Sequence, residues 1–255
     1  MTRSLRPGPN RVWPATLPGV WRYGEPAMTA SGAPTVAHAF AAAATARPDA
    51  PLITFYDDAS GERTELSGAT LANWVAKTAN LCVDGLGLTP GAVAAVRLPP
   101  HWQTAAVLLG CWVAGLTVDA TGSDRADVAF VADTPAPADE VYALALDPLG
   151  MPFRGGPPPG TADFIVEMRP YGDRLPALAT IPAQVAFAPV TTHADLAGRP
   201  VATSYSRVLV DAGAHPDPAD WLVGPLMAGA SIVLCRHLDA ARLPDRLATE
   251  RATPL

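Results

Sequence analysis

The feature that most constrains the fold is an alternation of strand-like and helix-like segments along most of the chain. Short runs of β-branched, aromatic or other apolar residues fall at 52–56, 92–98, 116–120, 128–131, 141–146, 184–188 and 231–234. Apolar residues at helical spacing lie between or after them, at 36–44, 67–85, 102–114, 218–228 and 239–251. Alternation of this kind is typical of a mostly parallel sheet covered by helices. The sequence therefore predicts an α/β fold.

Local chemistry predicts one hairpin and the start of one helix. The run Leu52–Tyr56 is followed by turn-forming residues and then by Thr64–Leu66, which can return antiparallel to it. Ser67 is a suitable N-cap for the helix that follows. Gly85 or Gly87 is a suitable stop for that helix, because glycine adopts the backbone conformation that often ends one.

Composition divides the chain into a leader and one domain. Residues 1–27 hold four arginines, one acid and five prolines, and we expect a disordered basic leader, with Met28 as an alternative true start. Residues 28–255 have the apolar content of a globular domain. The stretch GGPPPG at 155–160 is a loop by composition, and we expect it to divide the domain into two lobes.

Charge and cysteine usage exclude several classes of protein. The net charge is −6 and no dense basic stripe occurs, which argues against nucleic-acid binding. The longest apolar run, 105–118, has 14 residues, whereas a membrane-spanning helix needs about 20. The cysteines lack paired spacing, so neither a disulfide framework nor a four-ligand zinc site is expected, and a reducing cytoplasm is the expected location. They are Cys82, Cys111 and Cys235.

Three polar features of the sequence could belong to a functional site, and for each a structural role is expected. Lys77, the only lysine in the chain, is expected to be a solvated side chain on a helix. Cys235 and His237 alternate at a strand end, so both can face one side, but a packed thiol and a surface imidazole are expected rather than a metal site. His193 with Asp195 is the best remaining polar pair, for which an N-terminal helix cap is the simpler interpretation. No catalytic residue and no metal site is predicted.

Four stretches carry a resemblance to a known superfamily. They are RPDAPLITFYDD at 47–58, LSGATLANWVAKTANLC at 66–82, LTPGAVAAVRLPPHWQTAAVLLGCWVAGLTVD at 88–119 and GPLMAGASIVLCRHLDAARLPDRLATERAT at 224–253. Their order and spacing resemble the N-terminal, AMP-binding subdomain of adenylate-forming enzymes: acyl-CoA synthetases, luciferases and peptide-synthetase adenylation domains. The last stretch closes with the acidic-basic-Thr signature of that superfamily. The resemblance implies a short, truncated form of this subdomain.

The phosphate-binding loop that the resemblance implies is altered. The superfamily's loop reads Thr-Ser-Gly-Thr-Thr-Gly-x-Pro-Lys, in which glycine amides wrap the triphosphate and lysine neutralises it. Here the strand-like VAFAP at 185–189 runs directly into VTTHADLAGRP at 190–200, as if the loop were deleted. The cofactor-binding candidates left at this position are Thr191, Thr192, His193 and Arg199.

The resemblance also implies which parts of a complete enzyme are missing. The sequence stops at Leu255, before the superfamily's aromatic-Gly-x-Thr-Glu stretch, its ribose-binding aspartate and its lid with the catalytic lysine. We therefore expect a degenerate, non-catalytic AMP-binding-like domain that needs no cofactor. Its expected partners are an apolar or acyl ligand, or a protein or second copy that covers exposed apolar surface.

An enzymatic alternative stays open from the sequence. The chain would then be half of an acyl-CoA ligase or another adenylate-forming enzyme, using the altered loop or a second chain. ATP and Mg²⁺ would be its cofactors, and Arg199 would replace the lost lysine in charge, although a rigid guanidinium substitutes poorly for a compact ammonium.

Overall fold

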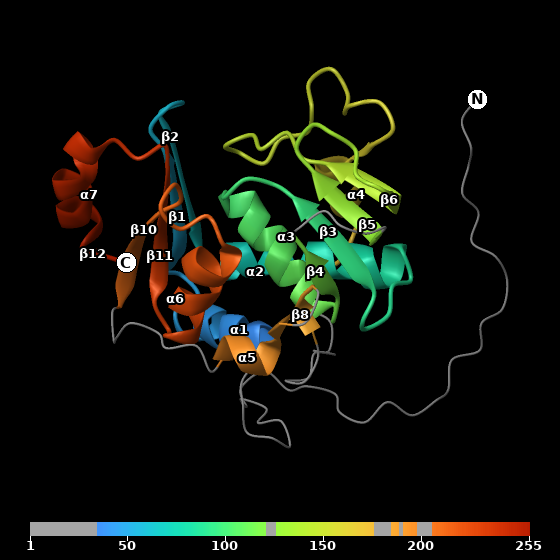
Figure 1. The fold of residues 1–255 in the computed structure, drawn as a ribbon, viewed down its shortest axis with the longest axis horizontal. Coiled ribbons are helices and arrows are strands. Elements are labelled where there is room, and N and C mark those ends of the chain that lie inside the picture. The colour runs from blue at the N-terminus through green and yellow to red at the C-terminus, as the bar shows by residue number, and fades with distance from the viewer. Residues whose placement is uncertain (1–34, 121–125, 176–184, 189–190, 198–205) are drawn as a thin grey trace, which may run out of the picture.

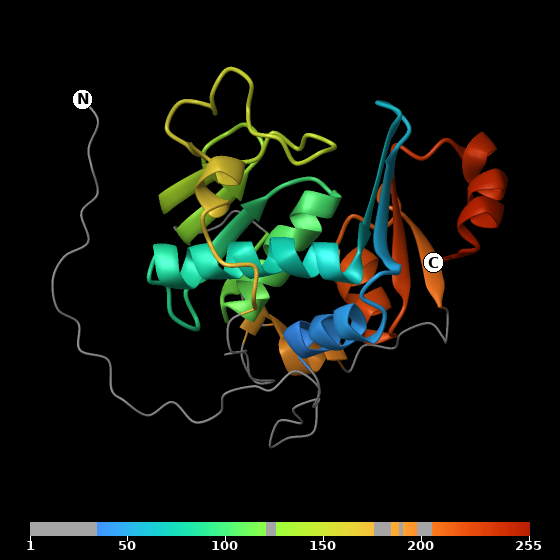
Figure 2. The ribbon, with the colours of Figure 1, turned by 180° about the vertical axis from the view of Figure 1, so that it is seen from behind.

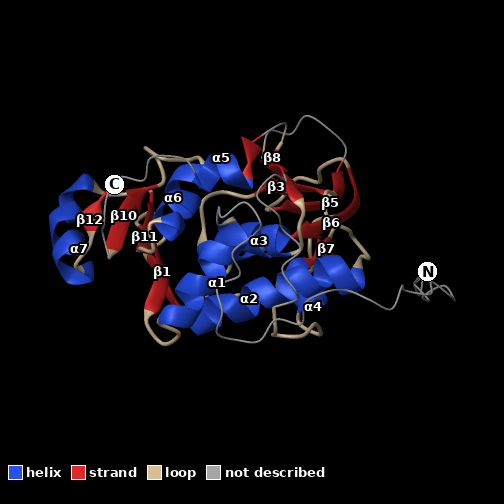
Figure 3. Cartoon of the chain, turned by 90° about the horizontal axis from the view of Figure 1, so that it is seen from below, coloured by secondary structure: helices blue, strands red, loops and turns tan. Residues whose placement is uncertain are grey.

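Two sheets enclose a layer of helices in the part of the chain that the computed structural model describes. That part comprises residues 35–120, 126–175, 185–188, 191–197 and 206–255. The predicted leader 1–27, Met28 and Arg199 lie outside it. Figure 1 shows one sheet beside the C-terminus and the other on the far side of helices α2 and α3, and Figure 3 shows the helical layer between them from below. The predicted α/β class, with mostly parallel sheets flanked by helices, is confirmed.

The first sheet joins the early hairpin to the end of the chain. Its strand order is β12-β10-β11-β1-β2, in which β1 pairs parallel to β11 and antiparallel to β2. The predicted hairpin is thus confirmed. The bounds are β1 Pro51–Asp57, β2 Glu62–Ser67, β10 Arg207–Asp211, β11 Ser231–Arg236 and β12 Thr253–Pro254.

The second sheet has the order β7-β6-β5-β3-β4-β8-β9 and is parallel except between β8 and β9. Its strands are β3 Val93–Arg97, β4 Thr117–Asp119, β5 Ala126–Val131, β6 Ala138–Ala143, β7 Ala162–Asp163, β8 Val185–Phe187 and β9 Thr191–Thr192. The strand predicted at 141–146 begins three residues earlier and ends at Ala143, because the chain turns through Leu146, whose φ is 51°. The loop at 155–160 joins β6 to β7, neighbours in this sheet, and the division into two lobes stays a prediction.

The helices begin where the sequence supplies caps. Ser67 accepts a hydrogen bond of 3.2 Å from the backbone N–H of Thr70 at the start of α2, as predicted. The helices are α1 Val36–Ala46, α2 Gly68–Asn80, α3 Trp102–Val113, α4 Phe164–Met168, α5 His193–Ala197, α6 Gly224–Met227 and α7 Leu243–Glu250. Two π-helical turns, η1 Leu81–Gly85 and η2 Ala219–Val223, and a 3-10 turn, η3 Ala240–Arg242, adjoin α2, α6 and α7. The helices predicted at 218–228 and 239–251 therefore each divide in two.

The core lies between the sheets, around α3. Every residue of α3 is buried, which explains why its sequence is apolar on all sides rather than on one stripe. Figure 2 shows α2 running alongside this layer from the hairpin toward the second sheet. Helix α7 instead packs on the outer face of the first sheet, where Leu243 and Leu247 contact a small cluster around Val233.

Gly110 of α3 packs directly against α2. A Cβ atom at this position would lie 2.5 Å from the Cβ of Thr78 and 3.2 Å from the carbonyl oxygen of Val75. Real Cβ contacts are not that short, so the two helices would have to separate. Only glycine fits here without a shift of the backbone.

Replacing Gly110 with alanine is expected to destabilise the protein. Overpacking should lower the free energy of unfolding by about 1–3 kcal/mol, partly offset by the better helix propensity of alanine, about 1 kcal/mol. Denaturant unfolding measures the sum. Gly155→Ala is the matched control, because no atom lies within 4 Å of its Cβ position. A Gly110→Ala protein as stable as the parent would show that α2 and α3 have room to move apart.

Candidate functional site

The altered phosphate-loop position lies at one edge of the second sheet. Strand β8 runs parallel to β4, and β9, which consists of Thr191 and Thr192, pairs back on β8 antiparallel. Helix α5 starts directly after β9, with His193 as its first residue. Three of the four predicted candidates are therefore adjacent here, whereas Arg199 lies outside the described residues.

Thr192 and Asp195 bind each other at the start of α5. The Asp195 carboxylate accepts hydrogen bonds from the backbone N–H of Thr192 at 2.8 Å and from its hydroxyl at 2.7 Å. In return, the Thr192 hydroxyl oxygen lies 3.1 Å from the Asp195 backbone N–H. These bonds lower the pKa of Asp195. The arrangement is a reciprocal helix cap that uses both polar groups of Thr192.

His193 points into the core and not toward Asp195. Its residue surface is fully buried, and its ring meets the Trp112 ring edge-on at a centroid distance of 6.4 Å. Neither ring nitrogen has a hydrogen-bond partner among the described residues. Burial, with a smaller effect from the nearby His38, lowers the pKa of His193 to about 4. His193 and Asp195 therefore do not interact, the helix cap expected at this position is formed by Asp195 with Thr192, and the His193 ring is neutral at physiological pH.

Lys77 is not the solvated side chain that the sequence predicted. Its ammonium group donates hydrogen bonds to the carbonyl oxygens of Arg169 at 3.1 Å and Tyr171 at 2.6 Å, in the segment that follows α4. The lysine therefore ties α2 to that segment. It contacts none of the residues at the altered loop position.

A second polar cluster surrounds a cavity of about 350 Å³ at the carboxyl ends of parallel strands from both sheets. Its lining residues are Asp57, Ser60, Gly61, Glu62, His101, Leu146, Pro148 and Arg236. Asp57 and Arg236 are the last residues of β1 and β11. His101 follows β3, and Leu146 follows β6. Open α/β sheets bind ligands at this end of their strands, which makes the cavity a candidate site.

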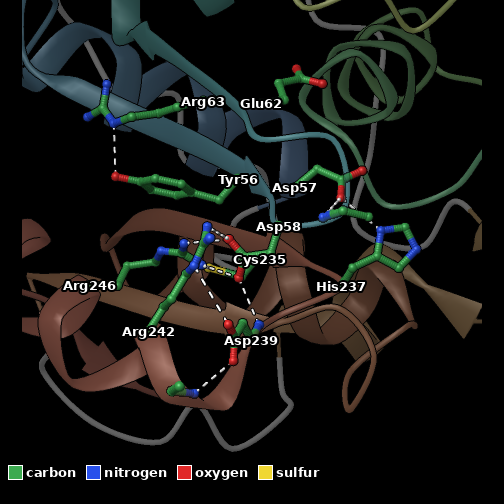
Figure 4. A network of polar contacts seen from close by, with 12 residues as sticks. Tyr56, Asp57, Asp58, Glu62, Arg63, Cys235, His237, Asp239, Arg242 and Arg246 are labelled. Carbon is green, nitrogen blue, oxygen red and sulfur yellow. Dashed lines mark hydrogen bonds and ion pairs between the residues drawn. The ribbon is translucent and has the colours of Figure 1, made fainter.

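One wall of this cavity is built from Asp57 and its partners (Figure 4). Asp57 Oδ1 lies 2.8 Å from His237 Nδ1, and Oδ2 lies 3.7 Å from Arg236 Nε. Burial alone would raise the pKa of Asp57, but the hydrogen bonds from His237 and the Ala59 amide outweigh it and lower the pKa. The carboxylate is therefore charged and already shared among several donors.

Cys235 and His237 do not face the same way. The Cys235 thiol is buried beside Arg246, 3.7 Å from its Nη1, and burial raises its pKa to about 11. The His237 side chain is 51% exposed and turns to Asp57 through a backbone φ of 50°. Across the described ranges, no group of three or more His, Cys, Asp or Glu residues is placed to hold a metal ion.

The opposite wall pairs Glu62 with His101, and sequence reasoning missed both residues. Their side chains are 8% and 2% exposed, and Glu62 Oε1 lies 3.4 Å from His101 Nε2. His101 caps α3, because its Nδ1 accepts a hydrogen bond of 3.1 Å from the Gln103 backbone N–H. An accepting Nδ1 places the proton of the neutral ring on Nε2. The only sequence signal was the position of His101 directly before a helix.

Comparison with known proteins adds one clear relative. No family model matches the chain. A protein of Mycobacterium tuberculosis (strain ATCC 25618 / H37Rv) named "TIGR03089 family protein" is 41% identical over 228 residues, which are 82% of this chain and 92% of that protein. Within the described residues, no helix is long and apolar enough to cross a bilayer.

Solved structures with the same fold include acyl-CoA synthetases and a CoA ligase. An acyl-CoA synthetase of Brucella canis matches 91% of this chain with a TM-score of 0.66 and 15% identity. A Mycobacterium tuberculosis fatty acyl CoA synthetase matches 86% with a TM-score of 0.56 and 14% identity. The anthranilate CoA ligase AuaEII, solved in complex with anthranoyl-AMP, matches 84% with a TM-score of 0.59 and 14% identity.

These matches show the fold of the chain and the share of each solved enzyme to which it corresponds. The chain spans about half of each solved enzyme: 48%, 48% and 47% of their lengths, respectively. The predicted resemblance to the N-terminal part of adenylate-forming enzymes is thereby confirmed. Since the identities are 14–15%, the matches carry the fold and not the reaction.

Proposed function

This chain belongs to the TIGR03089 family, and from that premise we propose that it is a degenerate, acyl-CoA synthetase-like domain that binds a ligand or a partner without adenylating a carboxylate. The proposal places it in the cytoplasm. The state of its cysteines supports that location, because all three are free and buried, as expected in a reducing compartment.

The observation that carries the proposal is the cap formed by Thr192 and Asp195. A nucleotide-binding loop needs free backbone N–H groups and hydroxyls that can donate to phosphate oxygens. Here the N–H and the hydroxyl of Thr192 both donate to the Asp195 carboxylate, at 2.8 and 2.7 Å. A triphosphate would have to displace that carboxylate and would meet its negative charge. The position is therefore poorly suited to anions.

Among the described residues, no cation is placed to offset this charge. No arginine or lysine contacts Asp195 in the part of the chain that the structure describes. His193 is neutral at physiological pH, because burial lowers its pKa to about 4. Lys77 donates to the backbone carbonyls of Arg169 and Tyr171.

An apolar groove supports the binding role. A groove of about 370 Å³ lies between α1, the start of β1 and α6. It is lined by Ala39, Ala42, Ala43, Ala46, Arg47, Ala50, Pro51, Leu52, Leu226, Met227 and Gly229. Arg47 is the one charged residue in this lining, so an acyl chain with a carboxylate fits both its apolar walls and its charge. Leu149 and Met151, which are 82% and 48% exposed, supply apolar surface for a partner.

Calorimetric titration with ATP and Mg²⁺ tests the proposal. We expect no saturable heat up to about 1 mM ATP, for the full chain and for a chain that begins at Met28, because the altered position offers a carboxylate where phosphates need donors. A cooperative thermal transition of the same samples is the control that they are folded.

Saturable ATP binding would overturn the proposal and support a ligase that uses the altered loop or a second chain. Thr192→Ala and Arg199→Ala would then be the variants that locate the nucleotide. Pyrophosphate exchange in the presence of fatty acids separates bare binding from adenylation, since exchange requires the acyl-adenylate to form and reverse.

A further inference from the structure

The cavity between Asp57 and Glu62 contains a buried ring nitrogen that makes no hydrogen bond, with Glu62 Oε1 as its nearest acidic neighbour at 3.4 Å. His101 is 1% exposed, and its Nε2 makes no hydrogen bond among the described residues. Its Nδ1 is held by the cap of α3, so the ring cannot turn to satisfy Nε2 without uncapping the helix. Buried donors that lack a partner are rare, and this one lines an open cavity. A ligand that accepts a hydrogen bond would satisfy it.

The same cavity contains the mostly buried Glu62 side chain, one oxygen of which makes no hydrogen bond to the described residues. Glu62 Oε1 lies 3.0 Å from the Thr64 hydroxyl and 3.4 Å from His101 Nε2. Oε2 makes no hydrogen bond or ion pair within the described part of the chain, although the side chain is only 8% exposed. A mostly buried carboxylate is stabilised by a positive charge or by several donors, which the ammonium group of a ligand would supply here.

The remaining charges restrict the ligand further. Asp57 is compensated by Arg236 and by His237, so these three groups add little attraction for a second cation. Two carboxylates nevertheless line the cavity, and both would repel a ligand that carries its own carboxylate or phosphate. The acceptor that reaches His101 must therefore be neutral, and the donor that reaches Glu62 must be positive.

We propose that this cavity binds a small hydroxylated amine, an amino alcohol or an amino sugar. Its ammonium group pairs with Glu62, and one of its hydroxyl oxygens accepts from His101 Nε2. The volume of about 350 Å³ suits a molecule of this size. The inference deepens the proposed function by naming a ligand class, and it rests on the binding role alone, because the site is separate from the altered phosphate-loop position.

The backbone around the cavity is strained in a way that fits a binding site. Leu146, which lines it, and His237, which bonds to Asp57, are non-glycine residues with φ values of 51° and 50°. Strained backbone of this kind persists where the surrounding structure over-determines it, often at functional sites. His237 directly follows β11, and Leu146 lies three residues after the end of β6.

Three matched probes test the proposal on the full chain. Serinol carries one amine and two hydroxyls, isopropylamine lacks the hydroxyls, and glycerol replaces the amine by a hydroxyl. Titrations followed by the ring ¹⁵N signals of the histidines should show saturable serinol binding that shifts His101. We expect serinol to bind at least about tenfold more tightly than either of the other two, since only it satisfies both groups.

Two variants assign the contacts. Glu62→Gln removes the charge and should weaken serinol binding at least about tenfold. His101→Asn keeps a capping side chain for α3 but removes Nε2, so it should reduce serinol affinity to that of isopropylamine without changing isopropylamine binding. Glu65→Gln is the matched control: it lies on β2 but bonds to Thr54 and Arg63 outside the cavity, and serinol affinity should not change.

The outcomes of these titrations distinguish a failure of this inference from a failure of the proposed function. Serinol binding no tighter than that of glycerol and isopropylamine, or equal losses from Glu62→Gln and Glu65→Gln, would overturn the inference. Neither result depends on nucleotide, so the proposed function would still stand or fall on the ATP titration alone. Conversely, ATP binding with intact serinol selectivity would overturn the proposed function and leave this cavity assigned.

Discussion

Replacing Glu250 with alanine should lower the free energy of unfolding by about 3–5 kcal/mol, because the change leaves a mostly buried arginine without its counter-charge. Glu250 ends α7 and is 8% exposed. Its carboxylate accepts hydrogen bonds from Arg207 at 2.6 Å, from the Tyr56 hydroxyl at 2.5 Å and from Arg63 at 3.2 Å. These partners belong to β10, β1 and β2, so one side chain ties α7 to three strands of the first sheet.

Denaturant unfolding of matched variants separates the charge from the contacts. Glu140→Ala, on an exposed position of β6, should change stability by no more than about 0.5 kcal/mol. Glu250→Gln keeps hydrogen-bond acceptors and should lose less than alanine. A double replacement of Glu250 and Arg207 by methionine should recover part of the loss, since it removes both buried charges. A loss below about 1 kcal/mol in Glu250→Ala would show that solvent can replace the ion pairs.

This network also gives a physical meaning to the acidic-basic-Thr signature at the end of the chain. Glu250 supplies the ion pairs, and Arg251 ends α7 in the left-handed region with a φ of 48°. Thr253 then pairs with Val208 as β12 adds to the edge of the sheet. The resemblance identified the motif, but only the strand order shows which side chains it reaches.

Caps, turns and apolar runs predicted many of the helices and strands, because each of these signals depends on residues that are close together in the sequence. Ser67 caps α2, and Leu52–Tyr56 forms the middle of β1 beside its hairpin partner. Apolar runs located most strands within a few residues. The error at β6 arose because Leu144 and Leu146 continue the apolar pattern, whereas the backbone leaves the sheet after Ala143.

The candidate cavity was not predictable from the sequence, because its pairs are far apart in the chain. Asp57 and His237 are separated by 180 positions, and they meet only because β1 and β11 are parallel neighbours with Asp57 opposite Arg236. Glu62 begins β2 in the first sheet, whereas His101 lies between β3 of the second sheet and α3. No local pattern contains that information.

The partners of two polar residues, Lys77 and Asp195, could not be assigned from the sequence. Lys77 was expected in solvent, but the segment after α4 brings two carbonyl oxygens to its ammonium group. The helix cap expected at His193 and Asp195 does form, but Thr192 is the partner of the Asp195 carboxylate and His193 lies in the core. Tertiary packing determines the partners of the Lys77 ammonium group, and a donor nearer than His193 binds the Asp195 carboxylate.

The stability of this protein is expected to fall steeply between pH 6.5 and pH 4 because of His193. Burial lowers its pKa in the folded state to about 4, whereas the ordinary value is 6.5. The unfolded chain therefore binds a proton in this range that the folded chain does not, so stability is complete above the ordinary pKa and is lost as the pH falls. At pH 4.5 the loss amounts to about 2–3 kcal/mol. His38, whose pKa burial also lowers, adds to the loss in the same direction.

The difference between the parent and His193→Phe isolates this effect. Phenylalanine keeps an aromatic ring beside Trp112 and cannot be protonated, and at pH 7 it removes two buried ring nitrogens that lack partners. Denaturant unfolding from pH 7.5 to 4.5 should show the variant gaining about 2–3 kcal/mol on the parent, with the carboxylate contributions cancelling in the comparison. His215→Asn, in the loop after β10, should follow the parent curve.

The outcome also bears on the altered phosphate-loop position, because His193 follows directly after Thr191 and Thr192. An imidazole that stays neutral down to about pH 4 contributes no positive charge to an anion at physiological pH. Direct titration of its ring signals by NMR checks this without requiring that any variant fold. Parallel stability curves, or a midpoint above about pH 6, would show that water or another group reaches the ring. The argument against a bound triphosphate would then rest on Asp195 alone.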